Sequence, residues 1–225
     1  MEMPQVEMQK KRILVVDDHP LLRAGLIQFI DRQKDMACCG EADSAASTQS
    51  AILCERPDLV LLDLRLRGED GLEFIKSLKA QFPKLLILVI SQCDEMLYTE
   101  RALRAGARGY IMKEEATEEV LFAIRAVLSG ELYLSRKLAI RLVQKTIEGR
   151  PAMAGPGVES FTDRELQVFQ LLGAGLSTRQ IAERLNLSFK TIETYRENIK
   201  HKLGLAGAAD LVRYATNWVE GRPGA

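Results

Sequence analysis

The chain has 225 residues, of which 47% are hydrophobic and 28% charged, an ordinary composition for a globular protein with one large or two small domains. It contains no run of about 18 apolar residues, and residues 1–12 lack the apolar core of a secretory signal, so we expect a cytoplasmic protein without a membrane partner. The net charge is zero, so charge alone does not predict binding to nucleic acid.

Residues 10–148 alternate between short apolar runs and helical patterns, beginning with the strand Ile13-Leu14-Val15-Val16. Five strand-helix alternations predict a parallel sheet with helices on both faces, and strands buried on both faces are continuously apolar, as these are. The sequence thus predicts a five-stranded, doubly wound α/β domain. In chain order the expected elements are strand 13–16, helix 21–32, strand 36–39, helix 45–55, strand 59–62, helix 71–81, strand 85–90, helix 97–105, strand 109–112, helix 117–129 and helix 135–148.

Residues 149–160, GRPAMAGPGVES, contain three glycines and two prolines and indicate a linker. The segment after it is helical throughout. Thr162 and Glu165 fit a T-x-x-E capping box, and Ser177 with Gln180 fits the matching S-x-x-Q pattern. Ser188 is expected to cap a third helix that runs to about residue 203, and a fourth spans 210–220. We therefore expect an α/β domain over 1–134, a helix and linker over 135–160, and an all-α domain over 161–225.

The four cysteines contain no C-x-x-C pair, which makes a metal site or a structural disulfide a weak alternative. We expect buried free thiols in a reducing compartment. The four residues are Cys38, Cys39, Cys54 and Cys93.

Polar residues stand at the carboxyl ends of four predicted strands, where open α/β sheets bind their ligands. Three carboxylates gathered at one edge repel one another, and a hard divalent cation with oxygen ligands resolves that repulsion. Taken singly, each acid could be a helix cap or a turn residue, and the lysine an ordinary surface lysine; the complete set favours a phosphoryl site. The strand-end residues are Asp17 and Asp18, Asp63, Ser91, and Lys113.

Within this set, Asp63 can act as a carboxylate nucleophile and form an aspartyl phosphate. Mg²⁺, or Mn²⁺ in its place, would offset the charge of the three acids. Lys113 and Ser91 would bind oxygens of the phosphoryl group.

Four segments, ILVVDDHPLLRAGL, PDLVLLDLRLRGEDGLE, LLILVIS and ARGYIMKE, resemble the receiver domain of two-component response regulators over about residues 12–130. The resemblance implies a flavodoxin-like fold, in which Asp17 and Asp18 hold Mg²⁺ and a sensor histidine kinase phosphorylates Asp63. It also implies that Arg65 gives a backbone carbonyl to the metal.

In that family the residue matching Ser91 shifts onto the phosphate, and the residue matching Tyr110 then rotates inward as the switch. The sequence departs from the family at two positions. Arg67 stands where many members have proline, and Gln92 stands where a smaller residue is common. We expect both departures to affect the lifetime of the phosphoryl group.

Residues 176–204 carry a helix-turn-helix pattern, with a short helix, a turn at Asn186-Leu187 and a longer second helix. The second helix has an apolar stripe of Ile192, Tyr195, Ile199 and Leu203 and an opposite polar face. That face would enter the major groove of double-stranded DNA. A plain helical interaction domain with a solvated face is the alternative. The polar face carries Lys190, Thr194, Glu197 and His201; the expected DNA contacts are Ser177, Thr178, Lys190, Thr191, Glu193, Thr194, Arg196, Glu197 and Lys200.

Residues 158–222 closely resemble the LuxR-type DNA-binding domain, and the two domains together look like the NarL/FixJ subfamily of response regulators. The resemblance implies a transcription factor that phosphorylation switches toward homodimers and DNA operator binding, with RNA polymerase as a further candidate partner. Its last helix often pairs two DNA-bound protomers. Leu211, Tyr214 and Trp218 are candidate dimer contacts, and packing within the domain is their competing role.

Two rival functions are weaker. An aspartyl-phosphate hydrolase would need a second acid in a D-x-D motif, which Asp63-Leu64-Arg65 lacks, and the two histidines give no Ser-His-Asp arrangement. We therefore expect no enzyme beyond the protein's own phosphoryl transfer and dephosphorylation. A receiver that acts unphosphorylated, as an interaction module, is the second rival, and the intact strand-end set argues against it.

Overall fold

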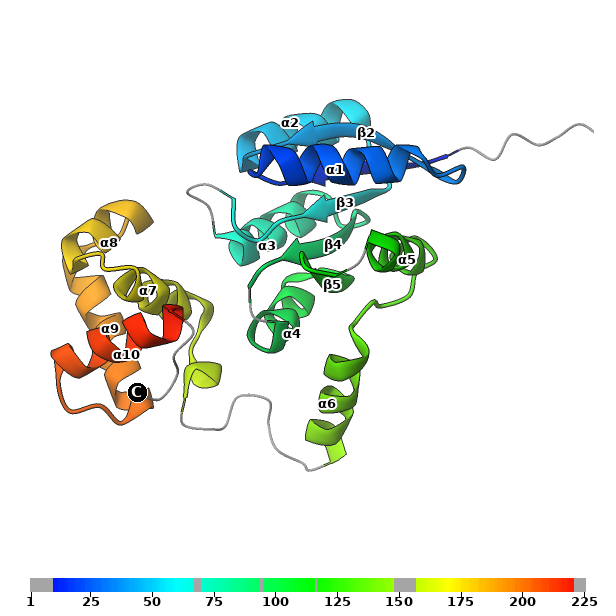
Figure 1. Cartoon of the computed structure of the whole chain (residues 1–225). Coiled ribbons are helices and arrows are strands. Elements are labelled where there is room, and N and C mark those ends of the chain that lie inside the picture. The colour runs from blue at the N-terminus through cyan, green and yellow to red at the C-terminus, as the bar shows by residue number, and fades with distance from the viewer. Residues whose placement is uncertain (1–9, 67–69, 94, 116, 148–156, 221–225) are drawn as a thin grey trace, which may run out of the picture. The chain divides into compact units, whose positions relative to one another are not determined.

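A computed structural model describes residues 10–66, 70–93, 95–115, 117–147 and 157–220. The first part is a five-stranded parallel sheet in the order β2-β1-β3-β4-β5 (Figure 1). This confirms the predicted parallel sheet. Its strands are β1 (Lys11–Val16), β2 (Met36–Ala42), β3 (Leu59–Leu62), β4 (Leu86–Ser91) and β5 (Gly109–Met112).

Helices cover both faces of this sheet, as the doubly wound prediction requires. Helices α1 (Pro20–Asp31) and α5 (Thr117–Leu128) contact each other over one face, and α3 (Gly71–Gln81) contacts α4 (Glu95–Ala105) on the other, with α2 (Ala45–Glu55) packed on β1 and β2. Because side chains alternate along a strand, Ile13 and Val15 join the core under α1 and α5. The sheet is thereby buried on both sides.

Strand β2 is longer than predicted because Gly40, Glu41 and Ala42 pair with the last three residues of β1, after a register shift at Ile13 and Leu14. One edge of an outer strand faces solvent, so the strand can include polar residues. The end of β2 therefore does not show as a continuous apolar run in the sequence. Helix α4 begins at Glu95, two residues before the expected start, and α1 begins at Pro20.

Both outer strands have part of their edge backbone paired. On β2, the N–H of Cys38 donates to Oδ1 of Asp31 at 2.8 Å. On β5, Tyr133 forms a bridge with Gly109, where an added Cβ would come within 2.9 Å of the Tyr133 carbonyl oxygen. A glycine is therefore required at that close approach.

The cysteine expectation is correct only in part. All four thiols are free, but only Cys93 is buried; Cys38 and Cys39 on the edge strand are half-buried, and Cys54 is exposed on α2. The apolar character of the surrounding sequence did not reveal that Cys54 lies on the solvent side of its helix.

The chain divides into two compact units, residues 1–142 and 143–225, and the division falls within α6 (Arg136–Ile147). The second unit is helical, as predicted. After the short 3₁₀ helix η1 (Val158–Ser160) its helices are α7 (Asp163–Gly173), α8 (Thr178–Leu185), α9 (Phe189–Leu203) and α10 (Ala208–Val219).

Local sequence signals set the ends of these helices. Both predicted capping boxes form, between Thr162 and Glu165 and between Ser177 and Gln180, and the Ser188 side chain caps α9. Asn186 ends α8 in a left-handed conformation at φ 53°, which produces the turn of the helix-turn-helix. Within the described residues, no helix is long and apolar enough to cross a membrane.

Candidate functional site

The carboxyl edge of the sheet brings together acids that are far apart in the sequence. Strands β1 and β3 are neighbours, and Val16 pairs with Leu62, so the residues that follow them, Asp17 and Asp63, come side by side. Asp17 is 0% exposed and Asp63 is 1% exposed. One ligand atom from each of Asp17, Asp18, His19 and Asp63 lies within 4.8 Å of the others.

Lys113 is the cation at the centre of this cluster. It follows β5, where its N–H donates to the carbonyl of Ser91 at 2.9 Å, and its side chain is only 4% exposed. Its Nζ lies 2.7 Å from Oδ2 of Asp63 and 2.7 Å from Oδ2 of Asp17. The structure therefore places the predicted lysine directly on the predicted acids.

The pKa values of Asp63 and Lys113 are both raised, for different reasons. Burial raises the pKa of the Asp63 carboxyl above its ordinary value, against the Lys113 ammonium and the Arg65 N–H, which lower it. Burial acts to lower the pKa of Lys113, but the carboxylates of Asp17 and Asp63 outweigh it and raise that pKa. Lys113 therefore stays charged, and its single charge only partly neutralises the neighbouring carboxylates.

The loop after β3 returns over the site. The N–H of Arg65 donates to Oδ1 of Asp63 at 3.1 Å, and the Arg65 Nε donates to the thiol sulfur of Cys93 at 3.3 Å. An added Cβ on Gly71 would lie 2.4 Å from the carbonyl oxygen of Leu64, so only glycine lets the start of α3 approach this loop. The predicted metal-binding carbonyl of Arg65 thus lies in a loop held by the hydrogen bonds of Arg65 and by the close approach of Gly71 to Leu64.

Ser91 and Tyr110 lie on the adjoining strands and share one neighbour, Cys93. Ser91 is fully buried and its Oγ accepts a hydrogen bond from the N–H of Cys93 at 3.1 Å. Tyr110 is also fully buried, and its hydroxyl donates to the carbonyl of Cys93 at 2.8 Å. The inward position of Tyr110, which the sequence resemblance associates with phosphorylation, is present in this structure. Gln92 is exposed, and Arg67 lies outside the described residues.

The donor set fits a hard divalent cation. It offers carboxylate oxygens of Asp17, Asp18 and Asp63, and the single positive charge of Lys113 leaves the three acids with a formal excess of negative charge. Mg²⁺ takes one or two protein carboxylates and keeps several waters, which suits a cluster at an open sheet edge.

Sequence reasoning passed over His19 as a member of this site. Its Nδ1 lies 2.9 Å from Oδ1 of Asp18 and 3.1 Å from Oδ1 of Asp17, and its N–H donates to the latter atom at 2.8 Å. Its position directly after the acidic pair was the signal that could have found it. The Asp17 carboxylate therefore also orders the turn that leads into α1.

In the second unit, α9 has the two faces that were predicted. Ile192 and Ile199 are fully buried, whereas Lys190 and Thr194 are exposed on the opposite side. Glu197 and His201 extend this exposed face. Its side chains are free of the core and are available to a partner such as a DNA groove.

Several expected DNA contacts instead have partners within the unit. Thr178 is buried, and its hydroxyl accepts a hydrogen bond from the Arg196 guanidinium, which also lies 3.0 Å from the Glu193 carboxylate. Lys200 is paired with Glu197 at 2.9 Å. Of the remaining predicted contacts, Ser177 caps α8, and Thr191 contacts the capping residue of α9.

The predicted dimer contacts on α10 pack inside the unit. Leu211 is 0% exposed. The rings of Tyr214 and Trp218 lie 6.1 and 5.6 Å from that of Phe169 on α7. Leu211 therefore has the competing role, intradomain packing, whereas Tyr214 and Trp218 are only partly buried and their part in a dimer stays a prediction. Amphipathic helices bury their large apolar side chains first, and α10 uses them to close its own core.

Comparisons with known proteins agree for both units. Residues 13–125 match the response regulator receiver domain family, and residues 159–215 match the bacterial regulatory proteins of the luxR family. The oxygen regulatory protein NreC of Staphylococcus aureus (strain JH9) is 33% identical over 208 residues, covering 91% of this chain and 96% of the relative.

Solved structures show the same fold. RcsB from Salmonella enterica serovar Typhimurium, bound to promoter rprA in the presence of the phosphomimetic BeF₃⁻, is 23% identical with a TM-score of 0.70, covering 92% of this chain and 98% of that one. A LuxR-family two-component response regulator from Aurantimonas sp. SI85-9A1 is 30% identical with a TM-score of 0.58, covering 61% of this chain and 99% of that one.

Proposed function

Because the chain belongs to the NarL/FixJ type of response regulators, with a receiver domain before a LuxR-type DNA-binding domain, we propose that phosphorylation of Asp63 switches its binding to DNA. Regulators of this type act on transcription. The single observation that carries the proposal is the buried contact of Lys113 with Asp63 and Asp17, at 2.7 Å each.

The phosphoryl group would come from a phosphohistidine of a sensor histidine kinase. An oxygen of the Asp63 carboxylate attacks the phosphorus, the new P–O bond forms as the P–N bond breaks, and the departing imidazole keeps the electron pair and takes up a proton. Asp17, Asp18, Asp63 and the Arg65 carbonyl would hold Mg²⁺ or Mn²⁺, which supplies charge neutralisation for the transferred group. We propose no other enzymatic activity.

Two residues of the chain would respond to the new phosphoryl oxygens. Lys113 is already 2.7 Å from Oδ2 of Asp63, so a phosphoryl group on Asp63 gives its ammonium a new anionic partner. Ser91 would exchange its hydrogen bond with the N–H of Cys93 for one to the phosphoryl group. Since the Tyr110 hydroxyl binds the carbonyl of Cys93, that exchange couples the modification to Tyr110.

The output would be a homodimer on double-stranded DNA. On α9 we assign Lys190 and Thr194 to the groove-facing side because both are exposed, with Glu197 beside them. Arg196 is paired within the unit, so we assign it to positioning α9 against Thr178. RNA polymerase is a further partner that we propose for the DNA-bound form.

Mass spectrometry tests the modification. After treatment with acetyl phosphate and Mg²⁺, the intact protein should gain about 80 Da, the mass of one phosphoryl group. Asp63→Asn should abolish the adduct, and Asp43→Asn, at an exposed acid outside the cluster, should retain it. No adduct in the parent protein under any phosphoryl donor would favour the unphosphorylated interaction module instead.

A further inference from the structure

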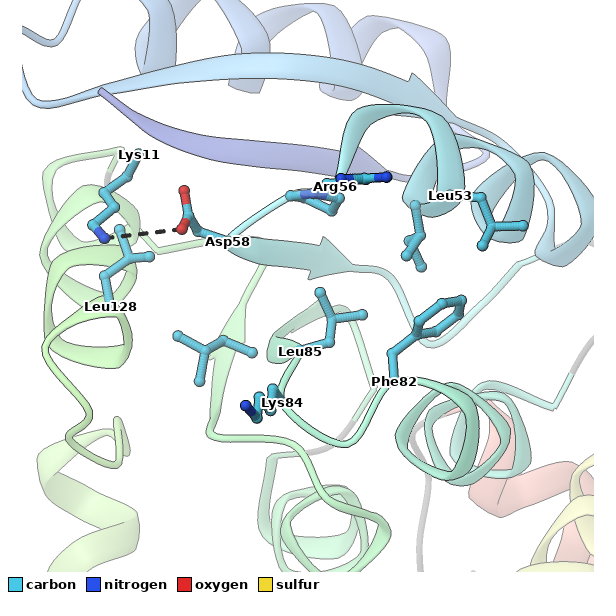
Figure 2. A pocket seen from close by; sticks show the side chains of 11 residues that line it. Lys11, Leu53, Arg56, Asp58, Phe82, Lys84, Leu85 and Leu128 are labelled. Carbon is cyan, nitrogen blue, oxygen red and sulfur yellow. Dashed lines mark ion pairs between the residues drawn. The ribbon is translucent and has the colours of Figure 1, made fainter. Parts of the chain in front are cut away.

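A pocket lies at the amino edge of the receiver sheet, the end opposite the acidic cluster. It is a pocket of about 600 Å³, within the range of small-molecule sites. Its walls come from the end of α2, the segment between α2 and β3, the first residues of β1 and β4, the segment after α3 and the end of α5 (Figure 2).

The interior of this pocket is apolar. Ile52 and Leu85 are buried, and Phe82 and Leu128 are partly buried beside them. Leu53 also lines the pocket and is 65% exposed, so a large aliphatic side chain faces solvent at its wall. A ligand with an apolar body would cover this surface and gain the free energy of burying it.

The rim is cationic. Lys11, Arg56 and Lys84 line the pocket with a single acid, Asp58, giving a formal charge of +2 for these four side chains. The acid is already engaged, because it accepts a hydrogen bond from the N–H of Arg12 at 2.8 Å and lies 3.8 Å from Lys11. Figure 2 shows Lys11 paired with Asp58 near Leu128, Arg56 after the end of α2, and Lys84 near Leu85.

Two of these cations have no counter-ion. In the described part of the chain, neither Arg56 nor Lys84 makes a hydrogen bond or an ion pair through its side chain. Arg56 is moreover in the left-handed region, with φ 48° and ψ 60°, where glycine is the residue that fits without strain. The chain therefore carries an unpaired guanidinium beside an apolar pocket at a conformational cost.

Complementing the carbonyl ends of α2 and α3 is a second use for these cations. Stabilising the carbonyl ends of these helices requires only a positive charge. Binding a ligand requires the charge together with the apolar wall of the pocket, so substitutions distinguish the two roles.

We propose that this pocket binds a small amphipathic carboxylate, whose apolar body packs against Ile52, Phe82 and Leu85 and whose carboxylate pairs with Arg56 and Lys84. This site is separate from the acidic cluster and does not depend on phosphorylation of Asp63. It gives the receiver domain an input of a second kind, a metabolite with an alkyl or aryl body and one acid group.

The test uses octanoate as the probe and the full-length ¹⁵N-labelled chain, with amide chemical shifts recorded during titration. Octanoate should shift the amides of residues 52–56, 58, 82 and 84–86 along a saturable binding curve that gives a dissociation constant. Octanol, which has the same chain without the charge, should bind about tenfold more weakly, a difference of about 1.4 kcal/mol. Asp63→Asn should bind octanoate as the parent protein does, which separates this site from the proposed phosphorylation.

Three substitutions complete the test. The double variant Arg56→Gln with Lys84→Gln should weaken octanoate about tenfold or more, and Lys34→Gln, at an exposed cation outside the pocket, should leave it unchanged. Arg56→Gly should raise the melting temperature by relieving the left-handed backbone and still weaken octanoate. Equal affinities for octanoate and octanol, shifts spread over the whole surface, or an unchanged affinity in the double variant would each overturn the proposal.

Discussion

The two units of the chain present their functional side chains in opposite ways. In the receiver unit, the side chains of Asp17, Asp63 and Lys113 at the carboxyl edge are buried and fixed by contacts of 2.7 Å. In the helical unit, Lys190 and Thr194 stand on the exposed face of α9. The difference matches the partners that we propose: transfer of a small charged group gains from desolvated groups set in advance, whereas a DNA groove is met by side chains that extend from a surface.

This contrast has an energetic side. A buried charge is costly unless it is paired, so each member of the receiver cluster depends on the others. An exposed side chain on α9 contributes little to folding and is free to contribute to binding. Substitutions of buried charged groups should therefore change stability, substitutions on the exposed face of α9 should change DNA affinity, and the following predictions test that division.

The largest effect on folding is expected for Lys113→Gln. Removing the ammonium leaves the buried carboxylates of Asp17 and Asp63 without their shared cation, and the free energy of unfolding should fall by about 3 kcal/mol. Urea denaturation with and without Mg²⁺ measures this, and Mg²⁺ should recover part of the loss by neutralising the same acids. The control, Lys76→Gln, removes an exposed pair with Glu73 and should cost under about 0.5 kcal/mol. An equal, small effect of both substitutions would break the contrast.

A smaller effect is expected for Glu165→Gln, because Glu165 is a buried charge in the helical unit. Glu165 accepts a hydrogen bond from Lys202 at 2.6 Å and another from the N–H of Thr162 at 2.7 Å. Burial acts to raise the pKa of Glu165, but these donors outweigh it and hold the pKa below its usual value of 4.5. The substitution should lower the free energy of unfolding by about 2 kcal/mol at pH 7.

The pH dependence of that loss follows from the direction of the shift. Because the folded-state pKa is depressed, the stabilisation is fully present above about 4.5, the unfolded value, and disappears as pH falls through the folded-state pKa. Denaturation curves of the two proteins should therefore converge only below pH 4.5. A difference that stays constant down to pH 2 would contradict the assignment to ionised Glu165.

The smallest effect, in DNA affinity alone, is expected for Lys190→Ala and Thr194→Ala. Each should weaken operator binding about tenfold, or about 1.4 kcal/mol, while changing the free energy of unfolding by less than about 0.5 kcal/mol. Fluorescence anisotropy at fixed salt measures the affinity, and Arg213→Ala, at an exposed cation on α10, is the control. Unchanged binding in both variants would remove these residues from the groove-facing side.

In both units, the features that follow from regular geometry could be predicted from the sequence. Apolar strands that each end in a polar residue were enough to place Asp17, Asp63 and Lys113 together, because a parallel sheet gathers the carboxyl ends of its strands. Helical periodicity was enough to separate the two faces of α9. Both inferences rest on regular geometry that a local pattern determines.

The burial and contacts of residues at the boundary between core and surface could not be predicted from the sequence. Periodicity did not show that Thr178 is buried beneath the Arg196 guanidinium or that Leu211 closes the core of its own unit. The amino-edge pocket was also beyond a local reading, because its walls come from the ends of several helices and strands. Such contacts depend on which elements meet, and no single segment encodes that.

The partly paired edges of β2 and β5 affect how readily copies of the protein aggregate. The Asp31 carboxylate occupies an N–H of β2, and Tyr133 pairs with the outer side of β5, so both margins of the sheet offer less unpaired backbone for strand addition by another chain. Aggregation through continuous intermolecular sheets is discouraged at both ends. The homodimer that we propose would then rely more on side chains, which unlike backbone amides can be selective about their partner.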